Sequence, residues 1–264
     1  LYVNNFPIGS PDSDYAQQLR VEGRWQKNAK GEDVPWLCPS HPANLELVEA
    51  AMVELARDYD IAGVQYDFIR YRGDDVCFCD RCRAGFEKRL GHAVENWPDD
   101  CLRDGPLHEQ WLDYRASLIT AAVRRTSAAI RAVNDDIIIS AAVFAMEPER
   151  AKTTVGQDWA LWCREGLLDA LCPMSYTPDN AAYEHTVGLI LDAVGEYVPV
   201  YAGIGLRSGN GVMRYPEQLA AKLNILRRLG APGFSMFCIT PPTDAPETVV
   251  IPLGDTMLTG DGRG

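Results

Sequence analysis

The chain alternates between short apolar runs and amphipathic helical segments, and this alternation is its strongest constraint on the fold. In the clearest helical segment, residues 109–133, apolar side chains recur at steps of three and four from Leu112 to Val133. The next run, 136–144, is β-branched and continuous, as in a buried parallel strand. Strands separated by helices are typical of parallel βα units. Six strands are predicted, at about 1–6, 63–68, 136–144, 168–175, 198–204 and 233–238.

An α/β chain of this kind forms either an open, doubly wound sheet or a (β/α)8 barrel of the TIM-barrel type. No strand is followed by the Gly-rich phosphate loop of a dinucleotide-binding fold, which favours the barrel. A closed barrel has eight strands, so six predict an incomplete barrel whose first two βα units are missing. We expect one barrel domain over 1–240 with a cysteine-bearing insertion at 73–108, then an irregular tail over 241–264.

The charge of the chain narrows the classes of partner. Lys and Arg number 25 against 37 Asp and Glu, a net charge of −12 with neutral histidines. Such a chain repels phosphate backbones, so nucleic acid is not an expected partner, whereas a neutral carbohydrate is compatible. No apolar run approaches the ~18 residues of a membrane span. An incomplete sheet would leave two unpaired edges, where self-association or pairing with another segment is expected.

The run "GVQYDFIRYR" places a carboxylate at the end of the second predicted strand. Catalytic groups of barrel enzymes lie at the carboxyl ends of strands. Because side chains alternate along a strand, Gln65 and Asp67 share the inward face, with Asp67 at the rim. The guanidinium of Arg70 is expected to lower the pKa of Asp67, which suits a nucleophile or a charge stabiliser. The alternative is a carboxylate that merely pairs with Arg70 at a strand end.

Glycoside cleavage normally needs a second carboxyl group. Glu147, Asp158 and Asp179 each follow a predicted strand and are candidates. Surface or helix-capping roles compete with catalysis for each of them, and Asp158 stands where a helix N-cap is expected. The substrate-binding candidates are polar and aromatic residues in or near the same strand-end loops: Asn4, Trp36, Arg70, Tyr71 and Tyr176.

The run "CFCDRC" supplies three thiols within six residues, Cys77, Cys79 and Cys82. With a fourth cysteine, either Cys38 or Cys101, they would complete a tetrahedral structural zinc site. Reduced cysteines without metal are the alternative. The four histidines are scattered without HxH or HExxH spacing, which disfavours a catalytic zinc.

Five blocks of sequence, in order along the chain, resemble the bacterial glycosyl-hydrolase-10-like family of TIM-barrel glycosidases. They are "WLCPSHP", "YDIAGVQYDFIRYRG", "CFCDRCRAGFE", "VGQDWALWCREGLLDALCPMSYT" and "YAGIG". The resemblance implies that Asp67 matches a catalytic aspartate and Asn4 a strand-end asparagine. It also implies a barrel that starts two strands earlier. The cysteine run is similar to the zinc loop of some β-galactosidase barrels, which favours Cys38 as fourth ligand. The chain departs from the family at Ser175, where relatives carry Asp or Asn.

These observations predict a glycoside hydrolase that uses carboxylates at strand ends and no cofactor for catalysis, with a possible structural zinc. Asp67 would be the nucleophile or stabilising carboxylate, and Glu147 or Asp158 the acid. A carbohydrate-binding barrel that has lost its second catalytic group is the alternative, motivated by Ser175 and the missing strands. A metal-dependent hydrolase is disfavoured by the histidine pattern.

Overall fold

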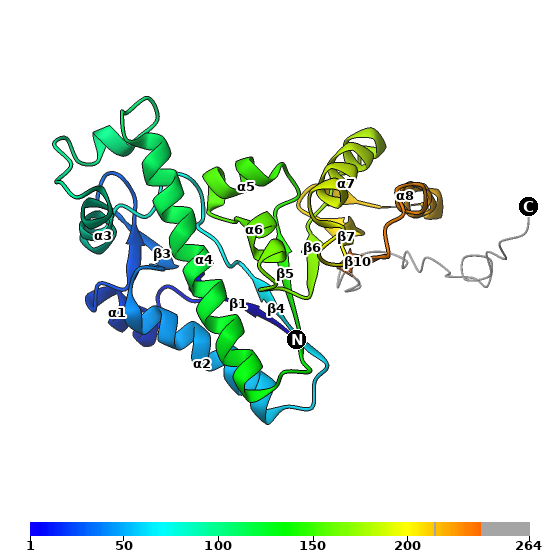
Figure 1. Ribbon diagram of the computed structural model, residues 1–264, viewed down its shortest axis with the longest axis horizontal. Helices are drawn as coiled ribbons and strands as arrows, with labels where there is room; N and C mark the ends of the chain where they lie inside the picture. Colours follow the sequence, from blue (N-terminus) through cyan, green and yellow to red (C-terminus); the bar gives the residue numbers. More distant parts are fainter. Residues whose placement is uncertain (214, 239–264) are drawn as a thin grey trace, which may run out of the picture.

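The computed structural model describes residues 1–213 and 215–238, and the predicted tail over 241–264 lies outside them. Six parallel strands lie side by side in the order in which they occur along the chain (Figure 1). A parallel bridge between Leu171 and Val200 joins the four-stranded part of the sheet to the two-stranded part. The strands are β1 (Tyr2–Asn4), β4 (Gly63–Asp67), β5 (Ile138–Val143), β6 (Ala170–Pro173), β7 (Tyr201–Gly205) and β10 (Gly233–Phe237).

Sequential strand order identifies a singly wound sheet. With right-handed crossovers throughout, every connecting helix lies on the same face, as in a barrel, whereas a doubly wound sheet reverses direction. The prediction of parallel α/β architecture is confirmed, and the doubly wound alternative is wrong. The helices are α1 (Asp14–Val21), α2 (Pro42–Asp58), α3 (Asp80–Leu90), α4 (His108–Val133), α5 (Pro148–Val155), α6 (Trp159–Arg164), α7 (Asn180–Val194) and α8 (Pro216–Arg228).

The segment between β1 and α2, in which no helix or strand was predicted, contains α1 and a hairpin of β2 (Trp25–Lys27) and β3 (Asp33–Leu37). Helix α5 was also not predicted. Both helices are only eight residues long, so they show too few turns for a clear periodic signal. Two short strands, β8 (Arg207–Ser208) and β9 (Gly211–Val212), form a second hairpin after β7.

The two faces of the sheet differ in burial. On the helix-covered face, Tyr66 and Ile139 are fully buried. On the other face, Gln65 and Ser140 are paired neighbours that are only partly buried, and the Ser140 hydroxyl donates to Oε1 of Gln65 at 3.2 Å. The hydrophobic core therefore lies between sheet and helices, and the inward face carries the polar groups.

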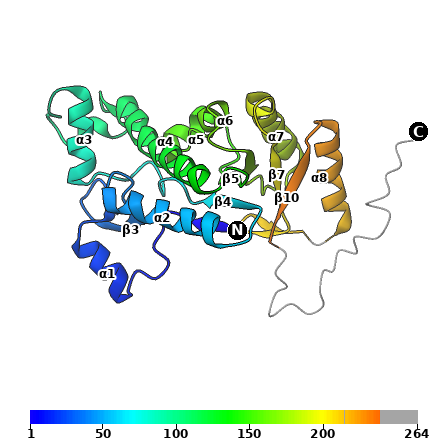
Figure 2. The same cartoon turned by 60° about the horizontal axis from the view of Figure 1, so that its bottom comes forward.

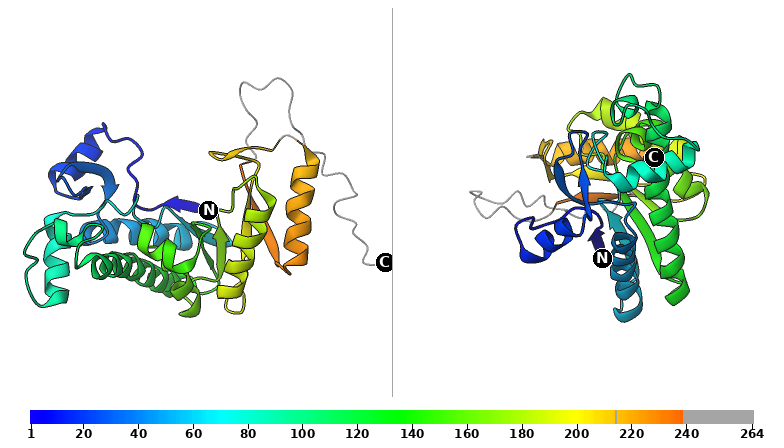
Figure 3. Two further views of the ribbon diagram at one scale, coloured as in Figure 1. Left: turned by 90° about the horizontal axis from the view of Figure 1, so that it is seen from above. Right: turned by 90° about the vertical axis from the view of Figure 1, so that its left-hand side faces the viewer.

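The cysteine-bearing segment 73–108 packs on the amino-terminal end of α4, at the opposite end of the molecule from α8 (Figure 2). Its core is a cluster of aromatic rings around Trp111, with Phe78 stacked 5.2 Å away and Trp97 and Phe86 edge-on at 5.2 and 5.1 Å. Helix α1 and the β2–β3 hairpin lie near this same end (Figure 3). None of the helices described here is long and apolar enough to cross a bilayer.

Candidate active site and candidate metal centre

The carboxyl ends of β1 and β4 place Asn4 and Asp67 side by side. The two residues are partners in the parallel register. The next residue, Asn5, fixes this junction because its backbone N–H and its side-chain amide both donate to the backbone carbonyl of Asp67, at 2.9 and 2.8 Å. Asn4 is exposed and Asp67 is partly buried, so both side chains are available at the rim where catalytic groups of barrel enzymes lie.

The carboxyl group of Asp67 has a raised pKa, contrary to the expectation from sequence. Its Oδ1 accepts the backbone N–H of Phe68 at 2.7 Å. Burial raises the pKa of Asp67 more than this hydrogen bond and the charge of Arg70 lower it. The predicted lowering by Arg70 is therefore wrong in its net effect. Phe68 has φ 50°, a left-handed conformation that is costly for a bulky residue and is found most often at functional sites.

Arg70 is held by aromatic rings. Its guanidinium lies 5.1 Å from the ring centroid of Trp36 and 4.7 Å from those of Phe68 and Phe144. The described residues include no ion pair between Arg70 and Asp67, so the reading of Asp67 as a salt-bridged strand end is not supported. The cation–π contacts bring Trp36 from β3 into the surroundings of Asp67, although it lies 31 residues earlier in the chain.

Tyr176, just beyond β6, forms an aromatic surface over the end of β7. Its ring stacks on Phe237 with centroids 5.3 Å apart and planes 16° apart. A Cβ added to Gly203 would lie 2.7 Å from the Tyr176 ring, and one added to Gly205 would lie 3.0 Å from its Cβ. The glycines of "YAGIG" thus leave room for the ring. Burial, with a contribution from the charge of Asp67, raises the pKa of Tyr176 to about 12.

The three candidates for a second carboxylate all stand at helix N-caps. Asp158 accepts the backbone N–H of Leu161 at 3.3 Å at the start of α6, and Asp179 accepts that of Ala182 at 2.7 Å at the start of α7. Burial raises the pKa of Asp158. Glu147 precedes α5, is exposed and makes no capping hydrogen bond. Asp158 and Asp179 therefore act as helix caps, whereas the Glu147 carboxylate makes no capping hydrogen bond.

Tyr71, a predicted substrate contact, is fully buried. Its backbone N–H donates to the carbonyl of Val155 at 2.8 Å, and the guanidinium of Arg115 lies 4.3 Å from its ring centroid. Its side chain cannot touch a substrate in this arrangement, because no part of it reaches solvent. The adjacent Arg70 lies among the aromatic rings near Asp67, whereas the Tyr71 side chain packs against Arg115.

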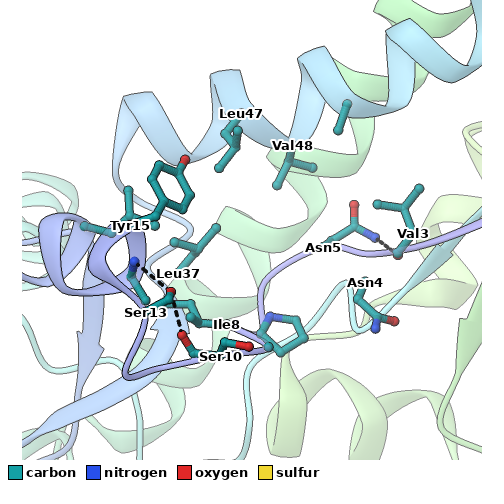
Figure 4. Close-up of a pocket in the computed structure, with 15 residues that line it drawn as sticks. Val3, Asn4, Asn5, Ile8, Ser10, Ser13, Tyr15, Leu37, Leu47 and Val48 are labelled. Carbon is teal, nitrogen blue, oxygen red and sulfur yellow. Dashed lines mark hydrogen bonds between the residues drawn. The ribbon is translucent and has the colours of Figure 1, made fainter.

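One of the described cavities does not include Asp67 in its lining. It measures about 280 Å³ and opens beside β1, between α1 and α2 (Figure 4). Its wall is mainly apolar, with Leu37 and Val48 among the residues that line it, and its described lining contains no carboxylate or imidazole. Asn5 points towards α2 in this cavity, while Asn4 points away from α2. A second, more polar cavity of about 210 Å³ lies beside Tyr176, with Lys222 among the residues that line it.

The four cysteines favoured in the sequence come together. Their sulfur atoms all lie within 4.8 Å of one another, and all four side chains are buried. The sulfur of Cys38 lies 3.5 Å from Cys82, 3.6 Å from Cys79 and 3.7 Å from Cys77. Cys101, the rival fourth ligand, is not part of this cluster.

This geometry fits a tetrahedral metal ion. Zinc–sulfur bonds of about 2.3 Å in a tetrahedron place the sulfurs roughly 3.8 Å apart, close to the separations around Cys38. Donors to sulfur are present as well: the backbone N–H of Lys27 lies 3.4 Å from the Cys77 sulfur, and Ser40 Oγ lies 3.2 Å from that of Cys82. Cys79 is the N-cap of α3, and hydrogen bonds, first with Cys38, hold the pKa of its thiol well below the usual range.

Several residues near Asp67 carried no signal in the sequence. Phe68 and Phe144 follow strands but were not candidate site residues. Phe237 becomes relevant only because β10 pairs with β7, so that Phe237 lies opposite Gly205. The two glycines of "YAGIG" on the inward face gave the one available hint, because glycine in a strand often marks close approach of another group.

Comparisons with known proteins agree with the parallel α/β fold. Residues 10–204 match the family described as Glycosyl hydrolase-like 10. An S-layer-related protein of Niallia circulans is 30% identical over 122 residues, which cover 41% of this chain and 8% of that protein.

Solved glycosidase structures share the fold. The glycoside hydrolase domain of PgaB (BpsB) from Bordetella bronchiseptica superposes with TM-score 0.64 at 17% identity, covering 82% of this chain and 65% of that one. A catalytic mutant of Gan42B, a GH42 β-galactosidase of G. stearothermophilus, gives TM-score 0.66 at 13% identity, covering 94% and 42%. The chain thus spans less than two thirds of these relatives. Because the family match covers most of its residues, the chain belongs to the glycosyl hydrolase-like 10 family.

Proposed function

We propose that this domain cleaves glycosidic bonds of a carbohydrate, with Asp67 as the central catalytic carboxyl group. The observation that carries the proposal is the place of Asp67: at the carboxyl end of β4, beside the exposed Asn4 and close enough to Tyr176 for its charge to act on that phenol. A carboxyl group with neighbouring amide and aromatic groups is typical of a sugar-binding site, in which sugar rings stack on aromatic side chains and amides bind sugar hydroxyls.

In this proposal Asp67 is the general acid, a role that the direction of its pKa shift, raised by burial, favours over that of nucleophile. Asp67 would protonate the glycosidic oxygen as the bond from that oxygen to the anomeric carbon breaks. Glu147, which makes no capping bond, is the candidate base that would take a proton from the attacking water. Asn4 would hydrogen-bond sugar hydroxyls, and the Arg70 guanidinium among its aromatic rings would stabilise the carboxylate left on Asp67.

The test is product release across a panel of glycans of different sugars and linkages. Reducing ends that accumulate in proportion to enzyme support hydrolysis. Saturable binding with no product would support instead the second candidate, a non-catalytic carbohydrate-binding barrel. Two observations favour that candidate: Ser175 is buried with its hydroxyl turned to the Pro173 carbonyl at 3.5 Å, and Asp158 is engaged as a cap.

The aromatic surface formed by Tyr176 is testable through the glycine beneath it. Gly203→Ala would place a methyl group 2.7 Å from the Tyr176 ring and 2.8 Å from the Pro173 carbonyl, so the ring must move. We expect glycan affinity to fall by roughly 2- to 10-fold, the value of one aromatic contact, as measured by calorimetry. Gly188→Ala in α7 is the control, because its added Cβ meets only Leu229, at 3.7 Å. Equal affinities for the two variants would remove Tyr176 from the binding surface.

We further propose that two additional strands complete the barrel between β10 and β1. The six parallel strands of residues 1–213 and 215–238 are two short of closure, and inward-facing Tyr2 and Phe237 on the two edge strands are 66% and 49% exposed. Leu1 and Asn5 bond to β4, so by alternation the backbone groups of Tyr2 and Asn4 face the free edge.

An unpaired edge predicts self-association of the chain in isolation. We expect a concentration-dependent dimer in size-exclusion chromatography with light scattering. Tyr2→Pro, which removes an N–H facing the free edge, should weaken the dimer, and Tyr2→Phe should not. A monomer at every concentration, or equal dimerisation of both variants, would contradict pairing at this edge.

We also propose that Cys38, Cys77, Cys79 and Cys82 hold a structural zinc ion. Four sulfur ligands would leave no open position for water or substrate, so such an ion shapes the protein and takes no part in bond cleavage.

A further inference from the structure

A fully buried arginine without an ion-pair partner contacts the segment that leads into the four-cysteine cluster. Arg115, on α4, is 1% exposed. Its Nη2 donates to the carbonyl oxygen of Gly73, and its guanidinium lies over the ring of Tyr71. Among the described residues, Nε and Nη1 have no hydrogen-bond acceptor, and no carboxylate forms an ion pair with Arg115.

Such a residue calls for a counter-charge. Transfer of a guanidinium from water into the protein interior is costly unless an opposite charge lies nearby. The carboxylate that acts on Arg115 is that of Asp74, which is half exposed and pairs with Arg103 at 3.6 Å. It is therefore a weak partner, because solvent screens its charge.

The cluster with a bound divalent ion would supply the missing charge. Four thiolates around a divalent ion leave two net negative charges. Arg115 is tied to the segment that leads into the cluster, because it binds the carbonyl oxygen of Gly73, four residues before Cys77. Trp111, one turn earlier on α4, stacks 5.2 Å from Phe78, which lies between Cys77 and Cys79. The described residues offer no other buried anion to Arg115.

We propose that Arg115 is a positioning residue of the metal centre, whose guanidinium neutralises part of the charge of a divalent ion held by four thiolates. This inference rests on the proposed metal site. It also couples that site to the candidate active site, because Arg115 binds Gly73 and covers Tyr71 in the segment that follows Asp67 and carries Arg70. Loss of the charge of the metal centre would leave Arg115 without a counter-charge and so weaken the packing of this segment.

The test compares Arg115→Lys, which keeps a positive charge, with Arg115→Gln and Arg115→Met, which do not. Zinc affinity is measured on the refolded apo chain by competition with a chromophoric chelator, and cobalt(II) is used to record the thiolate-to-metal charge-transfer band. We expect the two neutral variants to lose about 10- to 100-fold in zinc affinity, which is the usual effect of mutating a residue that supports the metal ligands. Lys should recover most of the loss, with the cobalt band of four-thiolate coordination present in each loaded variant.

Three outcomes would overturn the assignment. Equal losses in the Lys and Gln variants would indicate packing instead of charge, and wild-type affinity in the Gln variant would indicate no role. A near-ultraviolet circular dichroism spectrum that matches wild type shows which variants are folded; if Arg115→Met unfolds, the Lys and Gln pair still decides. Failure of the wild-type chain to bind zinc would refute the metal site itself, and so is distinguishable from failure of the role of Arg115.

Discussion

Asp67→Asn is expected to abolish glycoside cleavage while the fold is retained. Loss of a general acid lowers the rate by about 10²- to 10⁴-fold, and asparagine keeps the Oδ1 that accepts the Phe68 N–H. Turnover on the best glycan of the panel measures the effect. Asp158→Asn is the matched control. Its carboxyl has a pKa raised by burial like that of Asp67, but it serves a helix cap, so we expect near-normal turnover and a stability loss of about 0.5–2 kcal/mol at most.

The same variant has a second, independent signature in stability. The folded-state pKa of Asp67 is raised above its ordinary value of 3.8, so the folded chain holds this proton more tightly than the unfolded chain does. The contribution of Asp67 to stability therefore falls as the pH rises from 3.8 through the folded-state pKa. Asp67→Asn removes this cost, so it should raise the free energy of unfolding at pH 7 and have no such effect below pH 3.8. Urea titrations at both pH values measure it.

Two results would contradict this account of Asp67. Unchanged turnover in Asp67→Asn would exclude the residue from the mechanism. A lower stability of the variant at pH 7 than at acid pH, relative to wild type, would show that the carboxylate is stabilised in the fold and would return Asp67 to the role of nucleophile or charge stabiliser.

Removal of one cluster cysteine is expected to have the largest effect on stability. Cys77→Ser should eliminate one equivalent of zinc per chain, measured by elemental analysis. A metal present at about 1,000 times its dissociation constant stabilises a fold by ~4 kcal/mol. Loss of this metal should therefore lower the melting temperature by roughly 8–16 °C for a domain of this size. A chelator should shift wild type in the same direction and leave Cys77→Ser unchanged.

Cys101→Ser is the control for this prediction. Cys101 is equally buried but lies outside the cluster, so its variant should retain the metal. Zinc loss in Cys101→Ser, or full zinc occupancy in Cys77→Ser, would show that the cluster is not the binding site. Activity measured at permissive temperature separates the structural ion from a catalytic one, because chelation should then reduce turnover only as far as it unfolds the chain.

The sequence by itself determined the order and kind of the main elements. The apolar periodicity of α4 and the β-branched run of β5 are local patterns that burial enforces, so both were recognised to within a few residues. The spacing of Cys77, Cys79 and Cys82 was also sufficient to predict that their three thiols cluster, because a loop and the first turn of α3 bring such neighbours together. Short elements such as α5, whose stability comes from packing, left no comparable signal.

Tertiary structure decided what the residues around Asp67 do. From sequence, Arg70 was a neighbour three positions away that should hold the carboxylate ionised; in the fold its guanidinium turns to the rings of Trp36, Phe68 and Phe144, and burial controls the pKa of Asp67 instead. Likewise Tyr71 is packed under Arg115. The physical reason is that desolvation and electrostatic pairing depend on which distant segments cover a group, and those distances are fixed only when the sheet and its helices assemble.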